Sequence, residues 1–439
     1  MNRRWFSFVP MLMALAAFAD PTVDNLTVKQ RWPWSGKVDI DFTLTADGPC
    51  DVTLQATYTG CETPIVFTNG VIAKTQVGLQ PGANHIVWDP ADSGFAGQSL
   101  ANFTVTAEAA TVASRTYLVL DLIDGSVTYA AEPPADGGWT NTVYKQTKMV
   151  FRRIPAGTYK IGNSLNMVKH VESGNAGRYA PMCPLRDVTV TSDFYMGIFK
   201  VTSAQQSAVV SGTQTGTTFT GYRFYYDELR GSYGTDGIDW PKTGYQVKPT
   251  SFIGRMRGKM QLDPAYTIDL PTDAMWEVAA RGTTVDTVIA NGGTIDDSTD
   301  DIKAMLVQCG WTQLNISAGD PGAPEPGSKY PSNGMAVGLK MPTPWGLYDV
   351  FGNLSELVLD ICTTTGDINA PTSETADPVG PTSDDATIPT GKDSPRRILR
   401  CCGYGSSLSW NSLAAFRGAA SSDGKNSARL CIYLNQIKK

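Results

Sequence analysis

The stretch PTPWGLYDVFGNLSELVLD, residues 342–360, decides the fold of the chain and contains its best candidate for a metal site. Asp349 and Glu356 lie on either side of a tight turn at Gly352 and Asn353, so two carboxylates and the backbone carbonyls between them can converge on one hard cation. Calcium prefers a mixed set of oxygen ligands of this kind. The same residues permit a simpler interpretation, in which Asp349 caps a turn and Glu356 is a solvated helix residue.

Five further stretches extend the pattern on both sides of residues 342–360. They are FRRIPAGTYKIGN (151–163), VTVTSDFYMGIFKVTSAQQ (188–206), YQVKPTSFI (245–253), IDLPTDAMWEVAARG (268–282) and RILRCCGYG (397–405). In order and approximate spacing, the six stretches resemble the formylglycine-generating enzyme family, also called the sulfatase-modifying factor family. The resemblance implies that residues 113–439 form a loop-rich α+β domain of the formylglycine-generating-enzyme type, which is C-type-lectin-like and low in regular structure.

The resemblance also implies which residues bind calcium. The family's site uses the positions that match Asp349, Gly352, Leu354 and Glu356, with side chains from the two acids and backbone carbonyls from the other two. Ser355 stands where the family usually has Trp, which weakens local packing without removing a ligand. A structural calcium ion is therefore the one cofactor expected.

Copper is not expected, although the founding enzymes of the family depend on it. They use molecular oxygen and copper(I), held by two cysteine thiolates, to oxidise a sulfatase cysteine to formylglycine. Aligned on the turn 401–404, these two positions fall at Ser406 and Asn411, and no cysteine occurs between Cys402 and Cys431. Hydroxyl and amide oxygens are poor ligands for copper(I). A related branch that holds iron with three histidines is excluded because the chain has only two histidines.

The adjacent cysteines Cys401 and Cys402 offer a weak replacement site. On an extended strand, neighbouring side chains point to opposite faces, so these two thiols cannot readily hold one ion together. Disulfides or buried thiols are the main expectation, and a redox role for the pair stays open. The other cysteines in this region are Cys183, Cys309, Cys362 and Cys431.

Three positions depart from the family's charge and packing pattern. Asp269 replaces a usual Arg, Lys200 replaces a usual Glu, and Ala428 replaces the aromatic residue of a closing Gly-Phe-Arg. The first two changes remove family charges, so we expect that an ion pair has been lost or reversed.

The segment after the cysteine pair is the predicted ligand-binding surface. Rigid aromatic side chains among small polar residues are typical of adaptable binding loops. The predicted ligand-binding residues are Tyr404, Ser406, Ser407, Trp410 and Asn411. In the alternative interpretation, Tyr404 and Trp410 are core aromatics of a loop-rich domain. The pattern also resembles the variable proteins of diversity-generating retroelements, which place mutable residues near the C-terminus.

The N-terminal region predicts export and a separate all-β domain. Residues 1–19 combine two arginines, an apolar run and an Ala-Phe-Ala pattern, which indicate a signal peptide and a secreted, periplasmic or cell-surface protein. Residues 20–112 read as short alternating strands of an Ig-like β-sandwich. Cys50 and Cys61 flank one of these strands and are expected to form a disulfide. No later apolar run is long enough to span a membrane.

Local signals predict three elements in the second region. YLVLDLI (117–123) reads as a strand. VTSAQQSAVV (201–210) reads as a helix with Thr202 as its N-cap, and 271–282 as a helix that starts at Pro271 and Thr272 and stops at Gly282.

These observations leave three functional hypotheses. The first is an exported family member without copper catalysis that binds an unidentified protein or glycan, either as a fixed surface-interaction module or as a variable protein of a retroelement. The second is an oxygen-dependent oxidoreductase that converts a sulfatase cysteine to formylglycine with a different metal arrangement. The third is a structural envelope protein. The net charge of −6 and the scattered basic residues argue against a nucleic-acid partner.

Overall fold

The structure is a computed structural model in which the chain divides into two compact units, Met1–Val112 and Ala113–Lys439. It describes residues 20–31, 35–60, 75–93, 95–162, 184–213, 216–232, 246–263, 266–282, 307–312, 315, 334–361, 375–379, 397–401, 403, 417–420 and 424–434. The predicted signal peptide, residues 1–19, lies outside these ranges.

The first unit is built from two three-stranded sheets, as the alternating sequence predicts. One sheet has the order β1-β2-β5 and the other β4-β3-β6. The strands are β1 (Thr22–Gln30), β2 (Val38–Thr45), β3 (Cys50–Thr57), β4 (Thr75–Leu79), β5 (Gly82–Trp88) and β6 (Thr104–Thr111). Every second side chain of β2 is buried, because a strand with one face on a core alternates inward and outward positions. Strands from both sheets contribute to one apolar cluster.

The second unit is organised around a six-stranded sheet of order β13-β18-β12-β9-β7-β8. Its strands are β7 (Tyr117–Asp121), β8 (Val127–Ala130), β9 (Lys148–Ile154), β12 (Phe194–Gly197), β13 (Tyr266–Asp269) and β18 (Cys431–Leu434). The described pairs in this sheet are antiparallel. β18 therefore lies inside the sheet, between β12 and β13, although it follows them in sequence. The strand predicted from YLVLDLI is β7.

Two smaller sheets complete the second unit. β10 (Gly157–Ile161) pairs with β11 (Arg186–Val190), and a four-stranded sheet has the order β16-β15-β14-β17. The strands of the latter are β14 (Glu356–Ile361), β15 (Arg397–Arg400), β16 (Arg417–Ala419) and β17 (Ser427–Ala428). The 3-10 turns of the two units are η1 (Pro90–Ser93), η2 (Val112–Arg115), η3 (Gly138–Thr140) and η4 (Thr142–Lys145).

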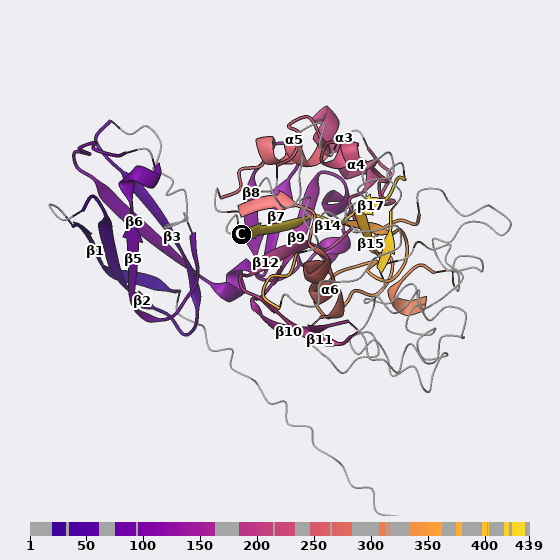
Figure 1. Cartoon of the computed structure of the whole chain (residues 1–439), viewed down its shortest axis with the longest axis horizontal. Coiled ribbons are helices and arrows are strands. Elements are labelled where there is room, and N and C mark those ends of the chain that lie inside the picture. The colour runs from indigo at the N-terminus through magenta and orange to yellow at the C-terminus, as the bar shows by residue number, and fades with distance from the viewer. Residues whose placement is uncertain are drawn as a thin grey trace, which may run out of the picture. The chain divides into compact units, whose positions relative to one another are not determined.

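The helices form where local sequence signals and tertiary packing agree. α3 (Ser203–Ser211) begins after Thr202, which forms a reciprocal capping box with Gln205, and ends at Gly212 in the left-handed conformation. α6 (Asp273–Arg281) has Thr272 as its N-cap and ends at Gly282, so both predicted helices are confirmed. α5 (Phe252–Lys259) contacts both α3 and α4 (Tyr226–Leu229), and the three helices lie on the same side of the second unit (Figure 1).

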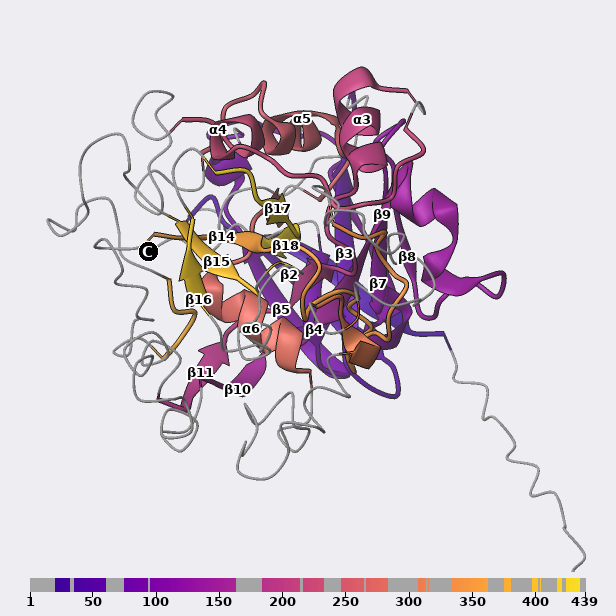
Figure 2. The ribbon, with the colours of Figure 1, turned by 90° about the vertical axis from the view of Figure 1, so that its right-hand side faces the viewer.

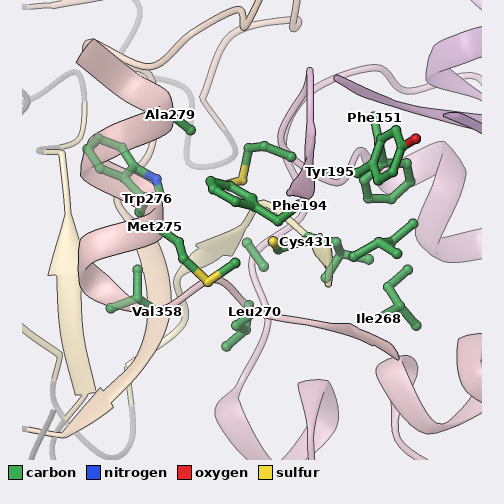
Figure 3. Packing of buried hydrophobic residues seen from close by; sticks show 14 of the residues in the cluster. Phe151, Phe194, Tyr195, Ile268, Leu270, Met275, Trp276, Ala279, Val358 and Cys431 are labelled. Carbon is green, nitrogen blue, oxygen red and sulfur yellow. The ribbon is translucent and has the colours of Figure 1, made fainter. Parts of the chain in front are cut away.

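α6 is buried on all sides and connects the sheets of the second unit. Each of its nine residues is buried, and it contacts β10, β14 and β15 (Figure 2). Met275 and Trp276 pack into the main apolar cluster with Phe194 and Cys431 (Figure 3). Burying a large apolar side chain contributes about 1.5–3 kcal/mol, so this helix is a major part of the core. None of the described helices is long and apolar enough to cross a membrane.

Candidate functional site

The turn between Asp349 and Asn353 is fixed by backbone geometry that its sequence permits. Asp349, Gly352 and Asn353 all have positive φ angles, of 55°, 102° and 64°. A β-carbon at Gly352 would lie 2.2 Å from the carbonyl oxygen of Trp311, so only glycine fits there. The side-chain amide of Asn353 accepts the N–H of Met335 and donates to its carbonyl oxygen. The turn is therefore held rigidly inside the domain.

Glu356, which follows this turn, is the centre of a buried charge cluster. It begins β14 and is fully buried, so the interpretation of Glu356 as a solvated helix residue is wrong. One carboxylate oxygen of Glu356 contacts the ammonium group of Lys200. Both carboxylate oxygens accept hydrogen bonds from the guanidinium of Arg429, and the shortest of these N–O distances is 2.9 Å. The indole N–H of Trp276 donates to the other oxygen at 2.6 Å. Although burial opposes ionisation most strongly, the two cations lower the pKa of Glu356 to about 2.

This arrangement does not fit Glu356 as a calcium ligand. The carboxylate is already neutralised by Lys200 and Arg429, and a divalent cation would have to displace both. Asp349 is also buried; its Oδ2 accepts the N–H of Gly338 at 2.8 Å, and burial raises its pKa. Within the described ranges, no cluster of three or more His, Cys, Asp or Glu residues could hold a metal ion. The calcium set that includes Gly352 and Leu354 stays a prediction that these contacts do not favour.

Cys401 is a buried thiol that supports the same turn. Its φ angle is +57°, so the expectation of an extended backbone at this residue is wrong. The sulfur accepts the backbone N–H of Gly352 and contacts the carbonyl oxygen of that residue. Burial raises the pKa of the Cys401 thiol to about 11, so the thiol is protonated at neutral pH. Cys402 lies outside the described residues, so the structure does not test the predicted opposition of the two thiols.

The other described cysteines are also protonated thiols. Cys50, Cys309, Cys401 and Cys431 are all thiols rather than disulfides, and burial raises the pKa of each. For Cys401 and Cys431, this confirms the buried-thiol alternative. The disulfide predicted between Cys50 and Cys61 is wrong for this structure: the Cys50 thiol contacts the carbonyl oxygen of Gly48 instead. The alternating pattern of β3 buries Cys50 inside the sandwich, where a thiol packs as a small apolar group.

A second charge cluster surrounds α6. Asp273 pairs with Arg400 and, at 2.8 Å, with Arg417; Glu277 pairs with Arg281 at 2.7 Å, with Arg400 at 2.9 Å and with Arg417 at 3.1 Å. All five side chains are at least 95% buried. The cations lower the pKa values of both acids despite burial, which acts in the opposite direction.

The residues on either side of the predicted ligand-binding segment are described, although the segment itself is not. Residues 404–416, which contain Tyr404, Ser406, Ser407, Trp410 and Asn411, lie outside the described residues. On one side is Gly403, where an added β-carbon would lie 3.8 Å from the carbonyl oxygen of Asn353. On the other side, Arg417 is tied into the α6 cluster and begins β16, which pairs with β15. The described residues on either side of the segment, Gly403 and Arg417, therefore lie against the rest of the domain.

Both departures in charge from the family pattern take part in buried ion pairs. Asp269 binds Arg230 and Arg257, with shortest distances of 2.7 and 2.8 Å, and Lys200 binds Glu356. Lys200 and Glu356 are 156 residues apart in sequence, and Arg429 is a further 73 residues away from Glu356. The only sequence signal for the pair of Lys200 and Glu356 was the unusual charge at position 200. The roles of Arg400, Arg417 and Arg429 were not predicted.

Comparisons with known proteins find two similar solved structures and one matching family description. The chain is similar to the structure of PvdO from Pseudomonas aeruginosa, with 17% identity over 65% of this chain and 94% of that chain and a TM-score of 0.40. It is also similar to the crystal structure of CarF, with 15% identity over 64% of this chain and 96% of that chain and a TM-score of 0.33. No curated protein sequence matches the chain. The family description that matches residues 140–427 identifies the chain as a member of the sulfatase-modifying factor enzyme 1-like domain family.

Proposed function

We propose that this protein is an exported, non-catalytic member of its family that binds a protein or glycan ligand through residues 404–416. In this proposal the family domain has a C-type-lectin-like α+β fold, and the preceding Ig-like sandwich displays it at the cell surface or in the periplasm. Calcium, if bound, has a structural role.

The state of the cysteines carries the non-catalytic part of the proposal. Copper(I) is held by thiolates, and a reactive cysteine needs a low pKa and some exposure. Cys401 has the opposite properties, because it is 1% exposed, it is hydrogen bonded to Gly352, and its pKa is about 11. The positions that align with the family's copper ligands are Ser406 and Asn411. A copper(I) site therefore has no obvious thiolate ligand in the described part of this region.

The frame around residues 404–416 supports the binding part of the proposal. Binding residues commonly lie on loops held by a rigid scaffold. Here the scaffold is the β14-β15-β16 sheet, with the buried turn at Asn353 on one side and the Arg417 ion pairs on the other. The segment between them, YGSSLSWNSLAAF, carries no charged side chain. Contact with a ligand would depend on aromatic surface and neutral hydrogen bonds.

Catalysis is tested with the full chain lacking residues 1–19. The protein is incubated with copper(I), oxygen and a peptide that carries a sulfatase-type cysteine motif, and conversion and retained copper are both measured by mass spectrometry. We expect neither formylglycine nor bound copper. The matched variant Ser406→Cys/Asn411→Cys restores two thiols at the aligned positions and is expected to retain copper. Formylglycine formation with stoichiometric copper in the unmodified protein would instead establish an oxidoreductase.

Binding is tested separately on arrays of glycans and of exported proteins. Trp410→Ala and Tyr404→Ala are expected to weaken any specific binding, because each removes a large aromatic contact surface. Tyr129→Ala is the control: Tyr129 is 37% exposed and lies on β8, far in sequence from the loop. Equal binding by all three variants would rule out the loop as the ligand site. An intact fold in each variant is checked by circular dichroism.

A further inference from the structure

Arg186 lies within electrostatic reach of the α6 charge cluster, and its Nε atom has no hydrogen-bond partner among the described residues. It is the first residue of β11 and pairs in register with Ile161 of β10. Gly162, which directly follows β10, donates its N–H to Glu277 at 2.7 Å, and its carbonyl oxygen accepts a hydrogen bond from Arg281. Arg186 is half-buried, and its buried Nε atom makes no hydrogen bond.

The two acids that act electrostatically on Arg186 are already paired with other arginines. Asp273 and Glu277 pair with Arg281, Arg400 and Arg417, as described above. Figure 2 shows α6 with β10 and β11 on one side and β15 and β16, which carry Arg400 and Arg417, close by. Asp360 is a third carboxylate in the group: it accepts the backbone N–H of Asp273, and its negative charge raises the pKa of Arg417. Among the described residues, the group therefore contains four guanidinium groups and three carboxylates. These are Arg186, Arg281, Arg400 and Arg417, and Asp273, Glu277 and Asp360.

Charges of both signs in the α6 cluster act on Arg186. Burial has the largest effect and lowers the pKa of Arg186; Arg417 and Arg400 lower it further, while Asp273 and Glu277 raise it. A buried guanidinium Nε–H without a partner among the described residues is costly, because this donor has been removed from water. Such a group is the usual partner of a phosphate, sulfate or carboxylate, which can accept two parallel hydrogen bonds from it.

We propose that Arg186 binds a tetrahedral oxyanion, phosphate or sulfate, either free or as a monoester on a larger ligand. Arg186 as a residue is only half-buried, so part of its side chain is open to an anion from solvent, and Arg400 and Arg417 of the α6 cluster add attraction for an anion. The site uses none of the residues of the 404–416 segment and does not depend on the function proposed for that segment.

The proposal is tested by calorimetric titration of the full chain lacking residues 1–19. Inorganic phosphate and inorganic sulfate are titrated separately in chloride buffer at constant ionic strength, so that general screening does not change. We expect one saturable site per chain. Glucose 6-phosphate and glucose 6-sulfate form a second arm: tighter binding of an ester indicates an anion carried on a larger ligand, and equal binding indicates the free ion.

Matched variants connect the binding to Arg186. Arg186→Gln is expected to weaken phosphate binding about tenfold or more, because charge-assisted hydrogen bonds are lost. Lys160→Gln makes the same change in net charge on the neighbouring strand, where Lys160 is 46% exposed and pairs with Asp187, and it should bind as the unmodified protein does. Arg186→Lys keeps the charge without the planar donors and should fall between the two.

Two results would overturn the proposal. One is the absence of saturable binding of any of the four anions to the unmodified protein. The other is undiminished affinity in both Arg186→Gln and Arg186→Lys. Folding is followed by thermal unfolding without added anion, in which Arg186→Gln should be no less stable than the unmodified protein, because the described side chains give Arg186 no partner to lose. A large loss of stability in this variant would show that the guanidinium is structural, against the proposal.

Discussion

Replacing Glu356 with Gln tests the buried charge cluster directly. The substitution keeps the shape of the side chain but leaves Lys200 and Arg429, both fully buried, without their negative partner. The pKa of Glu356 is about 2, against an ordinary value of 4.5. At about 1.4 kcal/mol for each unit of pKa, this difference corresponds to about 3 kcal/mol of stability at pH 7. Breaking buried ion pairs by removing one partner costs about 3–5 kcal/mol, which agrees.

The assay is urea unfolding followed by tryptophan fluorescence, which Trp276 reports from within hydrogen-bonding distance of Glu356. Lowering the pH protonates Glu356 and removes the same charge that the substitution removes. Because the folded pKa is lower than the unfolded value, the contribution of Glu356 is complete above about pH 4.5 and is lost as the pH falls toward 2. The difference in unfolding free energy between the two proteins should therefore close within that window.

A surface carboxylate provides the control. Asp187→Asn removes the partner of Lys160 from an exposed pair, which is expected to cost at most about 1 kcal/mol. A Glu356→Gln difference below about 1 kcal/mol at pH 7 would contradict the magnitude derived from burial and charge. A difference that stays constant down to pH 2 would show that Glu356 is not the group responsible.

Three further predictions concern the backbone and the thiols. Thr202→Ala should destabilise the second unit by about 1–2 kcal/mol in urea unfolding, because it removes the capping box of α3. Cys401 should resist alkylation by iodoacetamide at pH 8 in the folded protein, because its pKa is about 11. Since this folded pKa exceeds the ordinary value of 9.0, the contribution of the Cys401 thiol to stability is complete below about pH 9 and is lost as the pH rises toward 11. Unfolding of the unmodified protein and of Cys401→Ser across this pH range would measure that loss. Gly352→Ala should lower the free energy of unfolding by about 3 kcal/mol or more, since its β-carbon would meet the carbonyl oxygen of Trp311. Gly346 also has a positive φ, but the nearest contact of an added β-carbon there is at 3.7 Å, so Gly346→Ala should cost only about 1–2 kcal/mol. Equal losses in the two variants would show that φ alone matters.

Elements defined by local signals were predictable from the sequence. α3 and α6 begin at threonine N-caps and end at glycines, and these signals lie within a few residues of the helix ends. The strands of the first unit follow from alternation of buried and exposed side chains. The family resemblance placed the turn at Gly352 and Asn353, whose φ angles are both positive.

The contents of the candidate site were less predictable because they depend on contacts between distant segments. Nothing near Glu356 in sequence indicates that its partners are Lys200 and Arg429. Cys401 appeared to belong to an extended strand because cysteine has no preference for positive φ; its conformation is fixed instead by the hydrogen bond between its sulfur and Gly352. The same limit applies to Arg186, whose Nε atom is found to have no partner in the described part of the chain only once α6 and β11 are placed together.

The interior position of β18 has a consequence for how the chain is made. Synthesis produces β7, β9 and β12 long before Cys431–Leu434, the segment that pairs with β12 and joins it to β13. Until that segment emerges, the nascent chain exposes an unpaired edge on β12, which can pair with other chains and favour aggregation. A ribosome must therefore add more than two hundred residues after β12 before this sheet can close, so the second unit is expected to depend on chaperones during its synthesis and to be highly sensitive to any truncation that removes β18.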